Sequence, residues 1–129
     1  MVQVKIYGLK ENIAAKRSAL SDAIHNALGE AIGTPKEKRF QRFTILEAEN
    51  FIFPGDRSSN YTIIEINMFE GRSLEAKKNL IRLLYQKIGN ITDITARDLE
   101  ITIMETPKHH WGIRGVPGDE LNLDYKVDV

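Results

Sequence analysis

The sequence has no cysteine among its 129 residues. This absence excludes disulfides, thiolate nucleophiles and cysteine zinc sites together, so any chemistry must rest on amine, hydroxyl, carboxylate, imidazole or guanidinium groups. The 18 Lys and Arg residues balance the 18 Asp and Glu residues, so no overall positive field would gather nucleic acid or anionic lipid. A nucleic-acid-binding protein is therefore a poor first hypothesis.

The chain also lacks a long hydrophobic run. No segment approaches the roughly 20 apolar residues that span a bilayer, and the first residues alternate as a strand instead of forming the apolar core of a signal peptide. We therefore expect a cytoplasmic protein that does not bind membranes. A length of 129 residues predicts one domain, able to bury about two thirds of its unfolded surface without disulfides.

Two kinds of periodicity divide the chain. Alternating apolar and polar residues predict strands at residues 2–8, 39–49, 61–71 and 98–105. Apolar residues three and four positions apart predict amphipathic helices at residues 11–32 and 74–89. Gly33 and Gly89 are expected to end these helices, and Ser73 is expected to cap the second one.

The two halves of the chain follow the same order. The segment "VQVKIY" near the start corresponds to "TIIEIN" in the second half, and "FTILE" corresponds to "ITIME". Each half predicts a strand, a helix and a parallel strand, with pseudo-repeats at about residues 2–47 and 61–105. Because such crossovers are right-handed in nearly all cases, we predict an α+β fold in which a four-stranded sheet carries both helices on one face.

The strands carry more apolar residues than one face of such a sheet can use. The residues concerned are Ile63, Ile66, Phe69, Ile101 and Ile103. Since no further helix is predicted, the second face is expected to be covered by other copies of the chain, which favours a homotrimer. Alternation at residues 119–129 predicts a further strand that pairs with a neighbouring subunit, and residues 106–129 would then lie at the subunit interface.

Three segments together resemble the tautomerase superfamily, especially its long-chain branch, which includes malonate semialdehyde decarboxylase. They are "GTPKEKRFQ" (33–41), "DRSSNYTIIEINMFEGRSLEAKKNLIRLL" (56–84) and "DLEITIMETPKHHWGIRG" (98–115). The resemblance implies a single tautomerase-like domain over residues 1–129, with duplicated β-α-β units, assembled as a trimer. It also implies proton transfer without a cofactor by the amine of an N-terminal proline, while arginines hold a substrate carboxylate.

Two positions depart from the family pattern. Val2 stands where the proline is expected after removal of Met1. A free α-amine titrates near 7.7–8.0 and can still shuttle protons, so Val2 is a candidate base if Met1 is trimmed, whereas retention of Met1 displaces the amine by one residue. Lys38 stands where the decarboxylase branch carries an aspartate that helps to activate water, which disfavours decarboxylation or hydration by that route.

Arg72 is the first candidate for binding a carboxylate. It lies between the third strand and the second helix, where free backbone N–H groups and the helix dipole already favour an anion. The alternative is a surface ion pair with Glu70 or Glu75. Arg57 either joins Arg72 in the pocket or pairs with Asp56.

The segment "TPKHHWGIRG" (106–115) supplies the remaining candidates. His109 and His110 are adjacent, so on extended backbone they point to opposite sides and cannot readily share a metal; either an acid/base role for one of them or a surface position stays open. Trp111 is expected to pack, to line the pocket beside the N-terminus as its equivalent does in the family, or to do both. Arg114 reaches either that pocket or the carbonyls of another subunit.

Two hypotheses about function result. The first is a homotrimeric, tautomerase-like isomerase or related lyase that acts on a small 2-oxo acid or its enol without a cofactor or metal. The second is a catalytically silent trimer that kept the fold as a ligand-binding or structural module after losing the proline base. Under both hypotheses, the expected ligand is a small anionic carboxylate.

Overall fold

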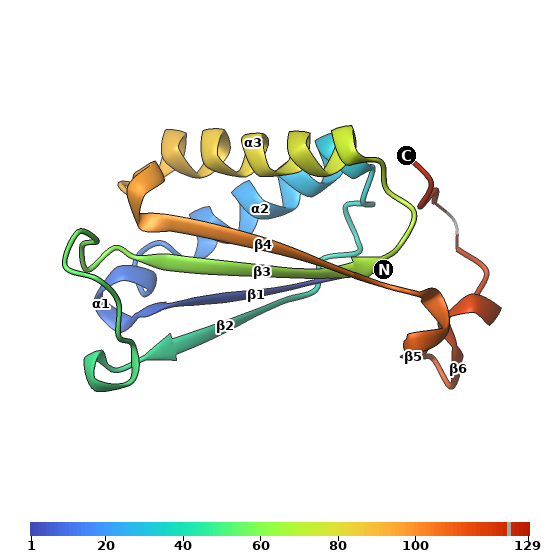
Figure 1. Ribbon diagram of the computed structural model, residues 1–129, viewed down its shortest axis with the longest axis horizontal. Helices are drawn as coiled ribbons and strands as arrows, with labels where there is room; N and C mark the ends of the chain where they lie inside the picture. Colours follow the sequence, from blue (N-terminus) through green and yellow to red (C-terminus); the bar gives the residue numbers. More distant parts are fainter. Residues whose placement is uncertain (124) are drawn as a thin grey trace.

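Four strands and two long helices form the frame of the computed structural model, which describes residues 1–123 and 125–129. The strands form one sheet in the order β2-β1-β3-β4, and both helices lie on one face of it (Figure 1). The strand bounds are Val2–Leu9 for β1, Gln41–Leu46 for β2, Thr62–Phe69 for β3 and Leu99–Thr106 for β4. The predicted α+β fold is therefore confirmed.

Each half of the chain is a strand, helix and strand in succession. The parallel strands β1 and β2 are connected through α2 (Arg17–Ile32), and the parallel strands β3 and β4 through α3 (Leu74–Ile91). The two halves meet where β1 pairs with β3 in antiparallel fashion. The start of β1 therefore lies beside the ends of β3 and β4, and we call this end of the sheet, with Met1, Phe69 and Thr106, the N-terminal end (Figure 1).

The first predicted helix is divided in two. A short helix, α1 (Lys10–Ile13), is separated from α2 by a turn. Asn12 is buried, and its Nδ2 donates hydrogen bonds to Asn60 O and to Thr62 Oγ1, both at 3.0 Å. These bonds hold α1 to the start of β3, so α1 does not continue the axis of α2. Gly33 ends α2 in a left-handed conformation (φ 71°), as predicted.

The second helix begins as predicted and ends later. Ser73 caps it, because its Oγ accepts a hydrogen bond from Ala76 N at 3.1 Å. The prediction that Gly89 ends the helix is wrong, since the helix continues to Ile91. Gly89 has no left-handed φ here, so it lowers helix stability without ending the helix. No helix within the described ranges is long and apolar enough to cross a membrane.

The face of the sheet toward the helices carries the main core. Buried side chains of β1 and β3 pack there against the inner faces of α2 and α3. Fully buried members include Ile6, Leu20, Ile24, Ile64, Ile66, Met68, Leu80, Leu84 and Ile88. Ile101 and Ile103 of β4 also pack against this core. Of the five residues counted as an excess for one face, Ile66, Ile101 and Ile103 therefore find room on the helix side.

The second face of the sheet is more polar. Its central strands contribute Gln3, Lys5 and Tyr7 of β1 and Ile63, Glu65 and Asn67 of β3. Tyr7 Oη donates a hydrogen bond to Glu65 at 2.7 Å, so two of these side chains satisfy each other. Phe69, the remaining apolar candidate besides Ile63, is fully covered by residues of its own chain. An excess of apolar strand residues is thus not a strong reason for a trimer.

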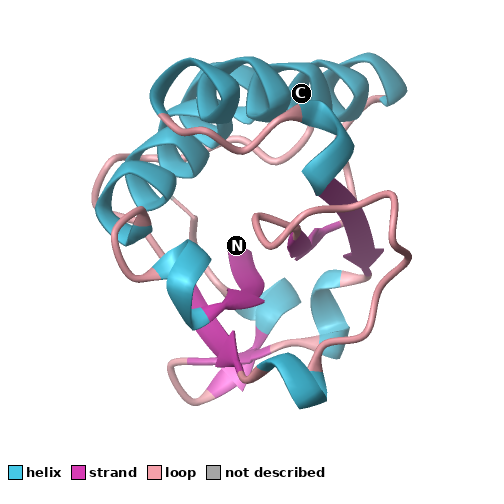
Figure 2. Cartoon of the chain, turned by 90° about the vertical axis from the view of Figure 1, so that its left-hand side faces the viewer, coloured by secondary structure: helices cyan, strands magenta, loops and turns pink. Residues whose placement is uncertain are grey.

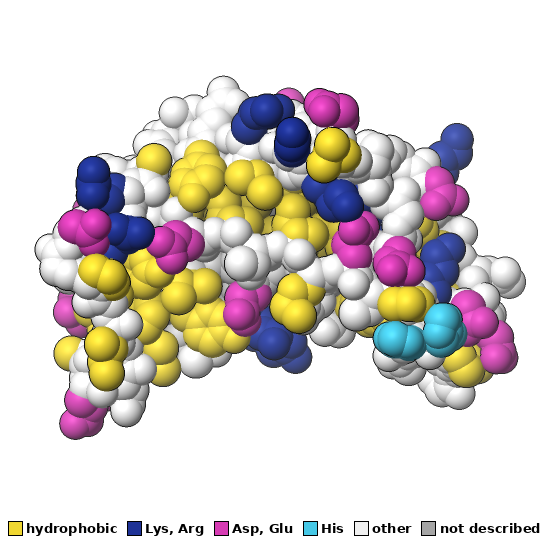
Figure 3. Space-filling model, viewed as in Figure 1, with side chains coloured by type: hydrophobic (Ala, Val, Ile, Leu, Met, Phe, Trp, Pro, Cys, Tyr) yellow, Lys and Arg dark blue, Asp and Glu magenta, His cyan; other side chains and the backbone are white. Residues whose placement is uncertain are grey.

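After β4 the chain turns below the N-terminal end of the sheet (Figure 1). It forms a 3₁₀ turn at Lys108–His110, a small hairpin of β5 (Gly112–Ile113) and β6 (Val116–Pro117), and a second 3₁₀ turn at Gly118–Glu120. Exposed histidine side chains lie together on this corner of the surface (Figure 3). This segment places a wall beside the first residue of the chain.

The chain then returns to the start of α3, where Figure 1 places the C-terminus, and Figure 2 shows the same end beside the helix layer. Ser73 N donates a hydrogen bond to Val129 O at 2.8 Å. Within 119–123 and 125–129 no strand forms. Within a single chain this segment therefore folds back onto its own protomer, and its predicted pairing as a strand with a neighbouring subunit stays a prediction.

The main core yields a stability prediction. Leu84 is fully buried on α3, so Leu84→Ala should lower the free energy of unfolding by about 2–5 kcal/mol, through lost burial and the cavity left behind. Leu74→Ala on the same helix is the matched control, because Leu74 is 64% exposed and its truncation should cost under about 0.5 kcal/mol. Urea denaturation measures both, and equal losses would contradict the described packing.

Candidate functional site

Met1 lies in a small hydrophobic cluster at the N-terminal end of the sheet. Its surface is 6% exposed, and it packs with Phe69 and Val127. We call these three residues the N-terminal cluster, which is separate from the main core. Phe69 N donates a hydrogen bond to Met1 O at 3.3 Å, so the backbone of the first residue is held beside the end of β3.

Burial and three cations act on the α-amine of Met1. Burial lowers its pKa most, and the charges of Arg72, Lys108 and Lys38 lower it further, from 8.0 to about 5. All four causes disfavour the ammonium form. The amine is therefore neutral at pH 7, which is the protonation state that a general base requires.

Arg72 follows β3 directly and is only 5% exposed. Its Nη1 donates to Phe69 O at 3.0 Å, while Nε and Nη2 have no hydrogen-bond partner among the described residues. Burial lowers the pKa of Arg72, and electrostatic interactions with Tyr125, Glu105 and Asp128 oppose that effect. Because a buried guanidinium with unpaired N–H groups is costly, Arg72 is well suited to accept a carboxylate ligand.

Trp111 forms the wall below the N-terminal cluster. Its ring meets Phe69 edge to face with centroids 5.2 Å apart, and its Nε1 donates to Thr106 Oγ1 at 2.7 Å. Both contacts fix the indole beside Met1. Trp111 and His110 also line a shallow pocket of about 400 Å³ on the second face of the sheet, together with Gln3.

The two histidines differ from their predicted arrangement. His109 and His110 lie in a 3₁₀ turn, not on extended backbone, and their rings meet edge to face with centroids 4.7 Å apart. Both side chains are exposed. Among the described residues, no group of three or more His, Asp or Glu side chains is placed to hold a metal ion.

Arg114 occupies the turn of the β5–β6 hairpin with a left-handed φ of 50°. It is exposed and is followed by Gly115, also left-handed at 86°. Two successive residues with positive φ are the requirement of a tight two-residue hairpin turn. The position of Arg114 is therefore explained by the hairpin, and its side chain is not enclosed with Arg72.

Arg57 precedes β3, whereas Arg72 follows it, and Arg57 lies near the start of β4, where Glu100 is its ion-pair partner. Its guanidinium pairs with Asp56 at 2.8 Å and with Glu100 at 2.7 Å. The structure therefore does not bring Arg57 and Arg72 together within one protomer. Of the two predicted alternatives for Arg57, the ion pair with Asp56 is the one that forms.

Val2 belongs to the main core and not to the N-terminal cluster. It stands opposite Met68 in the β1–β3 ladder and is 4% exposed. An amine at Val2 would exist only after removal of Met1. It would then lie one residue further into β1 than the amine described above.

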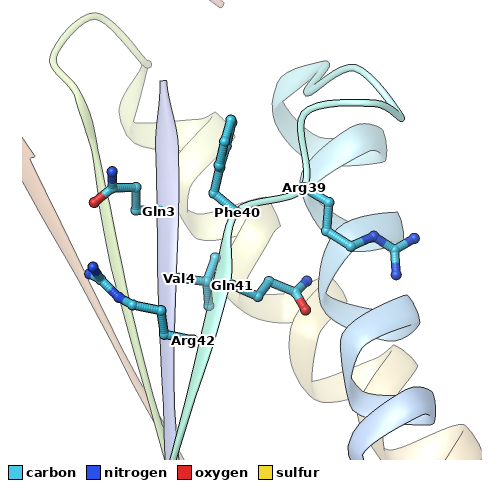
Figure 4. Close-up of a pocket in the computed structure, with 6 residues that line it drawn as sticks. All are labelled: Gln3, Val4, Arg39, Phe40, Gln41 and Arg42. Atoms are coloured by element: carbon cyan, nitrogen blue, oxygen red, sulfur yellow. The ribbon is translucent and has the colours of Figure 1, made fainter. Parts of the chain in front are cut away.

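A further pocket of about 260 Å³ opens beside the start of β1 (Figure 4). It is lined by Gln3, Val4, Arg39, Phe40, Gln41 and Arg42. The Arg39 side chain points away from the strands toward α2, where it pairs with Asp22 at 2.7 Å. Gln3 and Arg42 project to the other side of the strands, so Arg42 is the cation of this pocket that stays available to a ligand.

Sequence reasoning missed several groups of the site. Lys108 and Asp128 influence the Met1 amine or Arg72, and Val127 covers both Met1 and Phe69. Lys108 lies within the segment 106–115 discussed above, but the direction of its side chain depends on the turn that follows β4. Nothing in the local pattern around Val127 indicated that it returns to the start of the chain.

A family profile described as "Tautomerase enzyme" matches residues 38–114. The chain belongs to the tautomerase family. It is 37% identical over 60 residues to a 2-hydroxymuconate tautomerase of Pseudomonas putida, covering 46% of this chain and 95% of that protein. It is also 36% identical over 55 residues to a probable tautomerase of Ralstonia nicotianae, covering 43% of this chain and 79% of that protein.

Solved structures share the fold of this tautomerase-family protein over most of its length. A malonate semialdehyde decarboxylase superposes with a TM-score of 0.80 at 22% identity, covering 92% of this chain and 99% of the other. A second such decarboxylase, inhibited by 3-bromopropiolate, gives 0.71 at 26% identity over 85% and 87% of the two chains. Native fused 4-OT gives 0.80 at 23% identity, with 92% and 98% covered.

The low pKa of the Met1 amine predicts a dependence of stability on pH. The folded value of about 5 lies below the ordinary 8.0, so between these values the unfolded chain binds more protons than the folded one. The free energy of unfolding should therefore rise from pH 5 to pH 8, and this contribution is lost as pH falls through the same window.

The matched control is the same chain with an acetylated α-amine, which does not titrate. Urea denaturation of both forms from pH 5 to pH 9 should show the free-amine chain gaining stability relative to the acetylated chain up to pH 8. Above pH 8 the difference should be constant. A difference that does not change with pH across the window would show that the amine titrates normally.

Proposed function

We propose that this tautomerase-family protein is a cofactor-independent isomerase that interconverts a small 2-oxo acid and its enol. The α-amine of Met1 acts as the base, and Arg72 binds the carboxylate. The supporting observation is the buried amine among Arg72, Lys108 and Lys38, with a pKa lowered to about 5. A neutral amine beside fixed positive charge suits a reaction that develops negative charge on an enol.

The proton balance of this reaction needs no other reactant. The neutral amine of Met1 takes the proton of the enol hydroxyl, and the O–H electron pair forms the carbonyl as the double bond shifts. The resulting ammonium returns the proton to carbon, where the new C–H bond forms. Because its pKa is low, the ammonium is a good acid and gives up the proton readily.

The supporting charges have separate roles. Two donor nitrogens of Arg72, Nε and Nη2, have no partner among the described residues and can donate to a carboxylate. Lys108 and Lys38 raise the local positive potential at the amine, each with a smaller effect than Arg72. Trp111 closes one side of the cluster, which keeps water from the amine and so maintains the pKa shift.

The proposal requires a free amine at Met1, or at Val2 if Met1 is trimmed. With Met1 in place the amine lies among the cations described above. Trimming would move it into β1, opposite Met68. Val2 in place of the family's proline favours the second hypothesis, a silent binding module, which the experiment below distinguishes from an enzyme.

We also propose that the protein assembles as a homotrimer. The support is the fold that it shares with a fused 4-OT trimer, at a TM-score of 0.79 and 22% identity over 91% of this chain and 96% of that one. Sedimentation equilibrium should give the mass of three 14.7 kDa chains. A monomer at micromolar concentration would contradict this assembly.

Arg72→Ala tests the enzyme proposal. With 2-hydroxymuconate as the substrate, ketonisation followed by ultraviolet absorbance should show kcat/KM about 10- to 100-fold lower, because a charge-assisted carboxylate contact is lost. Arg82→Ala, an exposed arginine on α3, is the matched control and should leave kcat/KM unchanged. Circular dichroism checks that both variants are folded.

Three outcomes separate the hypotheses. A folded Arg72→Ala variant with unchanged kcat/KM would remove Arg72 from the site. No turnover by the wild type, with saturable binding of the enol acid that Arg72→Ala weakens, would favour the silent binding module. Loss of turnover in Arg72→Ala alone supports the enzyme.

A further inference from the structure

The last residues of the chain lie directly over the candidate site. Val127 is 5% exposed and packs against Met1 and Phe69. The carbonyl of Val129 accepts the hydrogen bond of Ser73 N at 2.8 Å. Ser73 is the N-cap of α3, so this carbonyl takes a backbone N–H that lies next to Arg72 in the chain.

Gly71 lets this segment approach so closely. Its φ is 132°, and a Cβ added there would lie 2.7 Å from Asp128 Oδ1 and 3.4 Å from Val127 O. Residues with a side chain rarely adopt this backbone conformation. Because Gly71 has no side chain, residues 127–129 can pack directly against the backbone before Arg72.

The segment also brings a carboxylate toward the cations of the site. The negative charge of Asp128 favours the charged form of Arg72. Lys108 lines a pocket of about 510 Å³, and Val127 and Asp128 of the last segment line the same pocket. Asp128 itself is exposed, so its carboxylate lies at the mouth of the site and not in its interior.

We infer that residues 127–129 form an inhibitory strap across the site. With the strap closed, Val127 packs against Met1 and Asp128 supplies negative charge near Arg72, so a substrate carboxylate competes with the strap. Substrate entry then requires the bond between Ser73 N and Val129 O to open. The identity of the competing ligand rests on the proposed function, but the strap itself rests only on the contacts above.

Hydrogen exchange at the Ser73 amide reports the strap directly. In the full chain this N–H should be protected, and oxalate, a small carboxylate probe, should accelerate its exchange with saturation. In a chain ending at Lys126, the amide should exchange rapidly without oxalate. If the strap is closed for about nine tenths of the time, the shortened chain should bind oxalate about tenfold more tightly.

Trp111 fluorescence measures that affinity, because Trp111 is the only tryptophan in the sequence and contacts the N-terminal cluster. Asp128→Asn keeps the Val129 carbonyl, so it should preserve protection of Ser73 while strengthening oxalate binding. Asp119→Asn, which alters an exposed carboxylate before the strap, is the matched control and should change neither readout.

Failure of the strap and failure of the proposed function give different results. Oxalate binding that leaves exchange at Ser73 unchanged, or equal oxalate affinity in the full and shortened chains, would overturn the strap. If no form binds oxalate, acylation of the Met1 α-amine at pH 9 still decides, because the amine is then largely neutral whether the strap is closed or removed. Faster labelling of the shortened chain supports the strap even then, and an unchanged labelling rate overturns it.

Discussion

The site depends on the burial of one backbone amine among positive charges. Water would stabilise an ammonium group at Met1, but the N-terminal cluster removes much of that water, and Arg72, Lys108 and Lys38 add repulsion. Both effects favour the neutral amine. Any change that exposes Met1 or neutralises these cations therefore alters the property on which the proposed chemistry rests.

The order of the strands explains why these groups meet. The antiparallel pairing of β1 with β3 places Met1 beside Phe69, and the parallel β4 brings Thr106 and the following segment to the same end. Arg72 follows β3 without a long loop, so a rigid sheet end positions it. The main core on the helix side stabilises this frame, while the separate N-terminal cluster carries the site.

Local patterns were sufficient for the frame and for one residue of the candidate site. Alternation and helical spacing predicted the four strands and both long helices, and the position between strand and helix singled out Arg72. The break after Ile13 was not predictable, because it follows from the bonds of Asn12 to a strand fifty residues away. The helix α3 continues beyond Gly89 to Ile91, because a glycine without a left-handed φ does not end a helix.

The rest of the site arises from contacts between distant parts of the chain. His109 and His110 were expected to point to opposite sides on extended backbone, yet the 3₁₀ turn places their rings against each other. Arg57 has the same chemistry as Arg72, but β3 separates them and acidic neighbours pair with Arg57. Val127 returns to Met1 only through the fold of the last segment, which no local periodicity encodes.

Direct titration of the α-amine tests the central claim best. Selective ¹⁵N labelling of methionine allows the Met1 amine nitrogen to be followed by NMR from pH 4 to pH 9, with an Arg72→Ala sample for comparison. The buried amine should titrate with a midpoint of about 5, and the midpoint should be higher in the variant, because one of the repelling cations is lost. A midpoint near 8 in the unaltered chain would rule out a neutral buried amine, since the group would then be charged and solvated at neutral pH.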